Sequence, residues 1–402
     1  MQTLLARAKW SLAVAVLVAC MSIGGGAWAQ NRYYIDSING ADDNDGRSAD
    51  HAWKTLANVE KIRLNSGDAL LLRRGSSWSG QQITLRSSGR PGRPITISGY
   101  GTGPSPILTD AAMGIDGNGQ SYIVIRDMRF QNMKGPAIRS TGSVDWRIEK
   151  VTIDRTGLGH DGSNMDFAGI QLWKSRDIVI DGATLTNVHG DGIWGWELQN
   201  VRIINSHVEV CQGGSADNVH LHAPRGYELR NNFFSMEGKT DSGKGNIHSQ
   251  GGTNGIIENN VFRGGNYGVG ITDDNLLIRR NQFFNHNHEK WSASILMSEV
   301  YDIHNNTIVE NTMTNATMGI YIFRDKYTRE NFRIEDNVFR QIKRSVMVIE
   351  SPISGVFAGN VLEDSPGAVL VQSNDWVVRG QKWQEAGNRV VPADRARSGQ
   401  AQ

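Results

Sequence analysis

Three short segments between residues 191 and 250 carry most of the side chains that could do chemistry. They read GDGIWGWE, ADNVHLHAPR and GKGNIHSQGG. Each has the composition of a short strand, in which successive side chains point to opposite faces. If Val219 and Ile247 point inward, His220 and His248 point outward, and parallel stacking places them about 4.8 Å apart. Since imidazole is an acid and a base near neutral pH, the segments predict an outward row of proton-transfer groups.

Tryptophan accompanies the histidines on the same predicted face. A tryptophan offers an apolar ring face with a polar edge, which suits the packing of sugar rings. The alternative is aromatic stacking that only stiffens the sheet. We favour a glycan groove, whose predicted substrate-binding residues are Trp173, Trp194, Trp196, Glu197, His222, Gln250 and Asp273.

The histidines and nearby cations fit a β-elimination reaction. A lyase that acts on a uronic acid must neutralise the sugar carboxylate, so that the neighbouring proton becomes acidic, and then needs a base. His220 or His248 would be that base. Arg225, Lys239 or Lys244 would neutralise the carboxylate. We therefore favour a lyase that cleaves a uronate-containing polysaccharide.

Nearby carboxylates leave a second chemistry open. Asp191 and Asp217 occupy the same place in successive segments. One strand spacing, roughly 5 Å, is also the carboxyl separation of a retaining glycosidase. Asp191, Asp217 or Glu197 could therefore serve a glycoside hydrolase, although aspartate before glycine or asparagine is also a common turn residue. A non-catalytic carbohydrate-binding surface protein is the third possibility.

Two places in the sequence offer ligands for a metal ion, and the pattern of residues does not establish a metal site at either. His220, His222 and His248 could bind zinc, but their spacing matches no closed motif, and we predict no metal ion in the site. The acidic run from Asp42 to Asp45 offers oxygen ligands for calcium or forms a solvated turn. Calcium is the one cofactor that the sequence leaves open.

A short motif that begins with a hydrophobic residue recurs about every 25 residues, a period typical of a solenoid with loop insertions. The motif begins at Ile125, Ile148, Ile180, Ile203, Leu229, Ile257, Ile278, Ile303, Ile334 and Phe357. Its fourth position is asparagine at Asn232, Asn260, Asn281, Asn306, Asn337 and Asn360. Asparagine tolerates left-handed turns, and its amide can hydrogen-bond along a stack of equivalent turns.

This repeat, with its asparagine ladder, resembles the right-handed parallel β-helix of the pectate lyase-like superfamily over about residues 125–372. The resemblance implies an all-β solenoid of about ten or more coils, in which the strand after each variable segment forms the substrate groove. A helix around Trp53–Leu64 would cap the first coil. The known hydrolase, epimerase and pectate lyase motifs of the superfamily have no convincing match, so the resemblance does not fix the reaction.

The ends of the chain predict export. Residues 1–29 read as a signal peptide, with an apolar stretch from Leu12 to Cys20 and a cleavage site after Ala29. Lipid attachment at Cys20 is the alternative. We expect a β-helix domain with its cap over residues 30–380, then a flexible tail over residues 381–402. The mature protein would be secreted or periplasmic.

The composition of the chain limits the kinds of binding partner that we expect. The 402 residues carry 42 basic and 41 acidic side chains, so nothing indicates a nucleic acid. No later segment has the length and hydropathy of a membrane span. After cleavage only Cys211 remains, which excludes an intrachain disulfide. We expect a monomer whose partner is its polysaccharide substrate.

Overall fold

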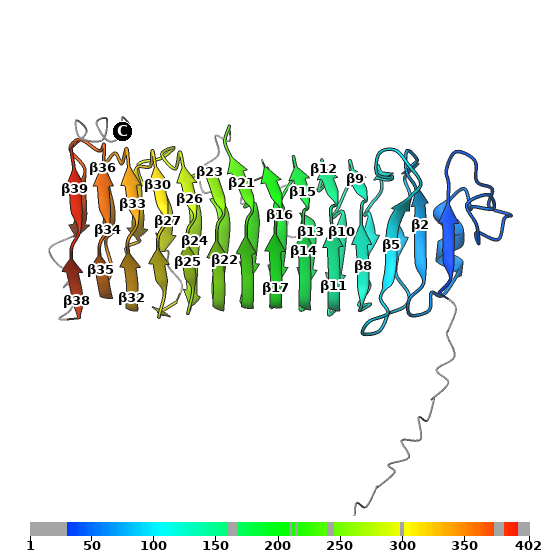
Figure 1. Ribbon diagram of the computed structural model, residues 1–402, viewed down its shortest axis with the longest axis horizontal. Helices are drawn as coiled ribbons and strands as arrows, with labels where there is room; N and C mark the ends of the chain where they lie inside the picture. Colours follow the sequence, from blue (N-terminus) through cyan, green and yellow to red (C-terminus); the bar gives the residue numbers. More distant parts are fainter. Residues whose placement is uncertain are drawn as a thin grey trace, which may run out of the picture.

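The computed structural model describes residues 30–159, 167–209, 211–213, 216–238, 245–297, 301–373 and 382–392. Over these ranges the chain is an all-β parallel solenoid, and the pairings between its successive coils are parallel (Figure 1). The predicted fold class is confirmed. The described residues include no helix long and apolar enough to cross a membrane.

Each coil contributes strands to three faces, which we call the first, second and third faces. The first face contains β4 (Ile83–Thr84), β7 (Ile115–Asp116), β10 (Ile138–Thr141), β13 (Ala168–Trp173), β16 (Asp191–Trp196), β19 (Val219–His222), the start of β22 (Gly245–Glu258), β24 (Tyr267–Asp274), β27 (Ala293–Met297), β31 (Met318–Ile322), β34 (Ser345–Ile349) and β37 (Val369–Ser373).

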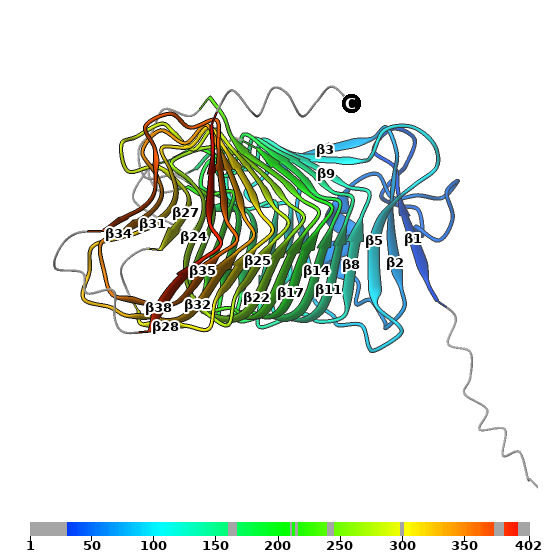
Figure 2. The same cartoon turned by 60° about the vertical axis from the view of Figure 1, so that its left-hand side comes forward.

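The second face lies beside it and contains the end of β22; Figure 2 shows many of its strands side by side. Its other strands are β1 (Arg32–Ile35), β2 (Ala69–Arg73), β5 (Ile95–Tyr100), β8 (Ile123–Arg126), β11 (Val144–Glu149), β14 (Arg176–Asp181), β17 (Gln199–Ile204), β20 (Arg225–Arg230), β25 (Leu277–Arg279), β28 (Ile303–His304), β29 (Thr307–Val309), β32 (Arg329–Glu335), β35 (Ile353–Ala358) and β38 (Trp383–Ala386).

The third face is a separate sheet of short strands. They are β3 (Ser77–Ser79), β6 (Ile107–Thr109), β9 (Arg129–Gln131), β12 (Thr152–Asp154), β15 (Thr184–Thr186), β18 (His207–Glu209), β21 (Phe233–Met236), β23 (Val261–Gly264), β26 (Gln282–Phe284), β30 (Thr312–Thr314), β33 (Val338–Arg340), β36 (Val361–Glu363) and β39 (Arg389–Val391).

The core is a set of inward rows in which equivalent residues of successive coils stack. On the first face Ile193, Val219 and Ile247 lie in register and are fully buried. On the third face Phe234 and Phe262 stack with ring centroids 5.5 Å apart. Each such side chain contributes roughly 1.5–3 kcal/mol by leaving water, so the rows that fix the coil register also supply the stability.

The predicted asparagine ladder is present, with one correction. Buried side-chain amides hydrogen-bond from coil to coil along Asn232, Asn260, Asn281, Asn311, Asn337, Asn360 and Asn388. Asn306 is not a member, because Ile308, and not Ile303, lies in register with Ile278. The coil holds two copies of the motif five residues apart, and the second copy occupies the turn.

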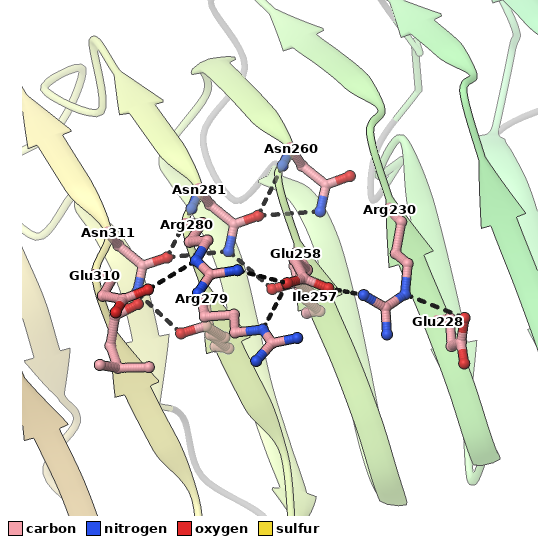
Figure 3. A network of polar contacts seen from close by, with 12 residues as sticks. Glu228, Arg230, Ile257, Glu258, Asn260, Arg279, Arg280, Asn281, Glu310 and Asn311 are labelled. Atoms are coloured by element: carbon pink, nitrogen blue, oxygen red, sulfur yellow. Dashed lines mark hydrogen bonds and ion pairs between the residues drawn. The ribbon is translucent and has the colours of Figure 1, made fainter.

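Outside the turn, the second face carries a charged network (Figure 3). Glu258, whose side chain is 5% exposed, accepts ion pairs from Arg230 and Arg279, and its Oε1 lies 3.6 Å from Arg280 Nη1. Arg280 also pairs with Glu310 at 2.7 Å. Paired in this way, a nearly buried carboxylate is tolerated, and it links three successive coils.

The two ends of the solenoid differ from the prediction in detail. In place of the expected helix over Trp53–Leu64 there is a shorter 3-10 helix, η1 (Leu56–Lys61), and its capping role remains a prediction. In the acidic run, Asp42 accepts hydrogen bonds from the amides of Lys54 and Thr55, so its oxygens brace the loop. At the other end β38 and β39 pair with the preceding coil, so the solenoid extends beyond residue 380.

Replacing Asn281 by alanine should destabilise the fold. The substitution removes two side-chain donations and leaves the buried amide of Asn260 without its acceptor. Each buried group left unpaired costs about 1–3 kcal/mol, so we expect a fall of several degrees in melting temperature. The neighbouring exposed position supplies the control: Gln282→Ala should change the free energy of unfolding by less than about 0.5 kcal/mol. Equal melting temperatures for the two variants would contradict a structural role for the ladder.

Candidate functional site

The predicted outward rows exist in the predicted register. Trp194 pairs with His220, and His220 with His248, along the first face. Two residues further on, Trp196 pairs with His222, and His222 with Gln250. The site is thus built by β13, β16, β19, β22 and β24, each supplying one rung.

Behind the histidines lie the two aspartates, which form two Asp–His pairs along the solenoid axis. His220 Nδ1 is 3.1 Å from Asp191 Oδ2, and His248 Nδ1 is 3.7 Å from Asp217 Oδ2. In both pairs the aspartate comes from the preceding coil. The aspartates are themselves held, because Asp191 accepts from the Asp217 amide at 2.7 Å and Asp217 accepts from the Gly245 amide at 2.8 Å. Both carboxylates are buried, so they orient imidazoles and have little access to a ligand.

The two paired imidazoles differ in exposure. Their rings stack with centroids 4.8 Å apart and planes 19° from parallel. The His220 side chain is 11% exposed, and its Nε2 is buried without a hydrogen-bond partner. The His248 side chain is 26% exposed. Of these two, His248 is therefore the imidazole that a ligand on the first face can reach.

Burial and mutual repulsion separate the protonation states. Burial, with the charge of Asp191, raises the pKa of Asp217 to about 7. Burial lowers the pKa of His248 to about 3, assisted by His220 and His222, and burial with His220 lowers the pKa of His222 to about 4. For His220 burial acts downward, but the hydrogen bond and charge of Asp191 outweigh it, and the pKa is raised. At neutral pH His248 and His222 are neutral beside a more basic His220.

Sequence reasoning missed Tyr267, which completes the buried end of the site. Its hydroxyl donates to Asp217 Oδ1 at 3.0 Å, although the two residues lie two rungs apart. The ring can cross the intervening rung because that position is Gly245, where a Cβ would lie 1.9 Å from the Tyr267 ring. The signal was available: Asp191, Asp217, Gly245 and Tyr267 each stand two residues before the inward β-branched residue of their strand.

Two buried asparagine side chains lie beneath the site and were also not predicted. Asn218 donates to Asn246 at 2.9 Å, and Asn246 donates to the Gly264 carbonyl at 3.0 Å. Each asparagine stands two residues before one of the paired histidines, His220 and His248. They fix the turn from which the strands of His220 and His248 start.

The tryptophans form a compact aromatic platform beside the histidines. Trp173 stacks on Trp196 with centroids 5.6 Å apart and planes 12° from parallel, and Trp196 lies 4.8 Å from the His222 ring. Trp194 is 5% exposed, because Trp173 and Trp196 cover it. The expectation that Trp194 contacts substrate is therefore corrected: it supports the other two rings from below.

The groove edge holds the charged candidates. Glu197 accepts from the Trp196 indole at 2.9 Å and lies 3.8 Å from Lys174 Nζ. Arg225 lines a cavity of about 410 Å³ together with these two charged residues. Neither His220 nor His248 lines that cavity, so Arg225 stands at the rim and apart from the Asp–His pairs. Beside it, a cavity of about 320 Å³ is lined by Trp196, His222, Gln250, Thr272, Asp274 and Tyr301 among others.

Asp273 does not face the groove, contrary to prediction. Its side chain is fully buried and accepts hydrogen bonds from the Tyr227 hydroxyl at 2.6 Å and the Gly252 amide at 2.7 Å. Strand alternation after Ile271 turns Asp273 inward, where it braces the irregular register between Gln250 and Thr253. Lys239 and Lys244, predicted to neutralise the substrate carboxylate, lie outside the described residues.

One group of described side chains has the composition of a metal site. Candidate ligand atoms of Asp217, His220 and His248 all lie within 4.8 Å of one another. A metal ion binds in the plane of each imidazole, about 2.0–2.1 Å from its nitrogen. Because the two rings stack almost parallel, no single point satisfies both planes. As arranged, the cluster does not fit a metal ion unless one ring turns.

Replacing Asp217 by asparagine should change how stability depends on pH. The folded chain raises the pKa of Asp217 from 3.8 to about 7, so between these values it binds more protons than the unfolded chain. The wild-type free energy of unfolding therefore falls as pH rises through this window. Urea titrations should show Asp217→Asn gaining stability relative to wild type from about pH 4 to pH 8, by at most about 4 kcal/mol.

The exposed Asp43→Asn variant serves as the control for that experiment. Because this side chain is exposed, the substitution should change the free energy of unfolding by less than about 0.5 kcal/mol. A difference curve for Asp217→Asn that is flat, or that falls with rising pH, would contradict the assigned protonation of Asp217.

Comparisons with known proteins agree with this geometry at the level of fold. A family model described as periplasmic copper-binding protein (NosD) matches residues 144–329, less than half of the chain. A lacto-N-biosidase of Bifidobacterium longum is 26% identical over 211 residues, which is 45% of this chain and only 13% of that enzyme. The matched segment is thus only a small part of that enzyme's length.

Solved structures of carbohydrate-active enzymes superimpose over most of the chain. A mannuronic acid-specific polysaccharide lyase of family 6 from human gut microbiota has a TM-score of 0.65 and 14% identity, covering 93% of this chain and 89% of that one. A family 136 lacto-N-biosidase from Eubacterium ramulus has a TM-score of 0.59 and 14% identity, covering 90% and 68%. A family 87 α-1,3-glucanase from Streptomyces thermodiastaticus has a TM-score of 0.60 and 11% identity, also covering 90% and 68%. The chain is therefore a right-handed parallel β-helix with the fold of these polysaccharide lyases and glycosidases, and its residues 144–329 are similar to the NosD family.

Proposed function

We propose that the protein is a polysaccharide lyase in which His248 is the general base. The observation that carries the proposal is the combination found at His248: an imidazole that is neutral at working pH, held from behind by a buried carboxylate, and partly exposed on the face that carries the aromatic platform. Neighbouring folds include lyases and glycosidases, which supports a carbohydrate substrate. We infer a uronate-containing substrate because a base can eliminate only where a sugar carboxylate makes the neighbouring proton acidic.

The proposed step is a β-elimination. Ionised Asp217 accepts the Nδ1 proton of His248, which leaves the Nε2 lone pair free toward the groove. The 3.7 Å separation closes to a hydrogen bond when substrate is bound, as catalytic contacts commonly do. Nε2 removes the proton next to the uronate carboxylate, the electron pair forms a carbon–carbon double bond, and the glycosidic oxygen leaves and takes up a proton. The products are one unsaturated sugar end and one ordinary end.

Positive charge must stabilise the carboxylate while that proton leaves. His220, whose pKa is raised despite burial through its bond to Asp191, supplies such charge beside His248. Arg225 at the rim, and Lys239 and Lys244, are the further candidates. Lys244 directly precedes Gly245, whose amide is bonded to Asp217. The attraction between such a cation and the substrate carboxylate is stronger in a groove from which water is excluded.

A glycoside hydrolase is the second candidate, and two observations favour it. The relative found by sequence is named as a lacto-N-biosidase. Asp217 also has the raised pKa, about 7, of a general acid. Against it, Asp191 and Asp217 lie buried behind the imidazoles, so neither reaches a glycosidic oxygen directly. Glu197 is half exposed but stands apart from both.

His248→Ala should abolish turnover by at least about a hundredfold, the usual effect of losing a general base. A panel of uronate-containing and neutral polysaccharides identifies the substrate, with ultraviolet absorbance reporting unsaturated ends and a reducing-end assay reporting all cleavage. The melting temperature should stay nearly unchanged, since His248 is partly exposed. The exposed His51→Ala variant should retain full activity.

The pH profile separates the two candidates. Below about pH 7 protonated Asp217 donates to His248 Nδ1, which forces the proton onto Nε2 and removes the base. Lyase activity should therefore rise through about pH 7 and lose that rise in Asp217→Asn. If Asp217 is instead the acid of a hydrolase, activity falls through the same pH and reducing ends form without absorbance. Full activity in His248→Ala would remove the base assignment altogether.

We also propose that the protein acts outside the cytoplasm, secreted or periplasmic, as a chain that starts at Gln30. The leader-like composition of residues 1–29 and the periplasmic description of the matching family support this. Intact-mass measurement of the exported protein should give the mass of residues 30–402. A mass that includes lipid on Cys20 would replace the free form with a membrane-anchored one.

A further inference from the structure

A separate cavity lies on the first face, on the N-terminal side of the aromatic platform. It has a volume of about 580 Å³ and is lined by Asp116, Asn118, Gly119, Arg139, Thr141, Gln171 and Trp173. Its outward residues continue the two rows of the candidate site, because Arg139 pairs with Gln171 and Gln171 pairs with Trp194. The cavity and the Asp–His pairs therefore belong to one straight track along the solenoid.

The cavity is distant from the proposed base. From Arg139 to His248 the row passes four rungs, which at about 4.8 Å per rung is roughly 19 Å. One sugar unit cannot span that length, whereas an extended oligosaccharide can. A ligand that touches both places must be a polymer lying along the track.

The contents of the cavity suit sugar hydroxyl groups. Arg139 Nη2 and Nε lie 2.8 and 3.4 Å from the two carboxylate oxygens of Asp116. The Arg139 side chain remains 41% exposed, and the pair presents donors and acceptors with no net charge. Trp173, partly exposed, supplies an aromatic wall whose position is fixed by stacking on Trp196. A polar pair beside an aromatic ring is a common design for binding a sugar.

On the opposite side of His248 the track ends early. After Gly270 the same row continues with Leu296 and Tyr321, which are each 8% exposed. These two side chains belong to an apolar cluster against which Trp291 and Phe323 pack. The row is apolar there, so a polymer has several rungs of polar and aromatic contact toward Arg139 and about one toward Leu296.

We propose that the Arg139–Asp116–Trp173 cavity is a distal subsite that binds an uncharged, hydroxyl-rich face of a sugar unit of the polymeric substrate. The inference rests on the proposed carbohydrate-cleaving function and extends it. The track is asymmetric, with a long binding arm over the N-terminal coils and a short arm beyond His248. Cleavage at His248 accordingly releases short products of narrow size from one end of a long bound chain.

The test compares Arg139→Gln with wild type on a size-graded oligosaccharide series prepared from the polysaccharide that wild type cleaves. For oligosaccharides long enough to reach the cavity, kcat/KM should fall about tenfold, the effect of losing about 1.4 kcal/mol of binding. For the shortest cleavable oligosaccharides it should stay unchanged. Arg147→Ala, an exposed arginine on the second face, is the matched control and should lose nothing at any length. Size chromatography of early wild-type digests should show short products of narrow size.

An equal loss at all lengths, or no loss at any, would overturn the distal subsite. A broad ladder of products at early times would overturn the asymmetric track. If wild type cleaves nothing on the panel, affinity electrophoresis in gels containing the same polysaccharides tests for the distal subsite by binding alone. Retardation of wild type that is lost in Arg139→Gln keeps the subsite while the proposed lyase function fails. No retardation of wild type on any polysaccharide removes both.

Discussion

Parallel backbone pairing in register is the constraint from which the rest of this structure follows. Once Ile193, Val219 and Ile247 stack in the core, every other position of their strands is placed in a row as well. Side chains in a row repeat at about 4.8 Å. The row therefore brings side chains that are far apart in the sequence into contact on the surface. The two imidazoles of His220 and His248 are neighbours for this reason alone.

The same constraint explains the electrostatics of the site. Stacking places Asp217 behind His248 and next to Asp191, so two carboxylates and two imidazoles share one buried strip. Two like charges at such a distance cannot both persist in a medium of low polarity. Burial, with the charge of Asp191, therefore raises the pKa of Asp217 to about 7, and burial, with His220 and His222, lowers the pKa of His248 to about 3. The platform of Trp173 and Trp196 is built the same way, from equivalent positions of adjacent coils.

The sequence made the rows predictable because the hydrophobic motif and the alternation of strands are local patterns. The parallel solenoid, the outward row from Trp194 to His248 and most of the asparagine ladder follow from them. The ladder member Asn311 could not be predicted, because two motif copies compete within one coil and only the packed coil selects between them. The burial of Trp194 depends on Trp173 of the preceding strand as well as on Trp196 of its own strand. The inward turn of Asp273 accompanies an irregular register in the neighbouring strand.

Tyr267 illustrates why some of the site escapes a strand-by-strand reading. Its contact with Asp217 exists only because the rung between them lacks a side chain, so three strands must be considered together. The Tyr267 hydroxyl is also among the groups that lower the pKa of Asp217 against the effect of burial.

This contact makes the tyrosine a link between ligand occupancy and proton uptake. A ligand that pushes the Tyr267 ring off Gly245 withdraws a hydrogen bond from Asp217, and the carboxyl then takes up a proton at a pH where it was ionised before. A ligand that presses the ring down has the opposite effect and releases a proton.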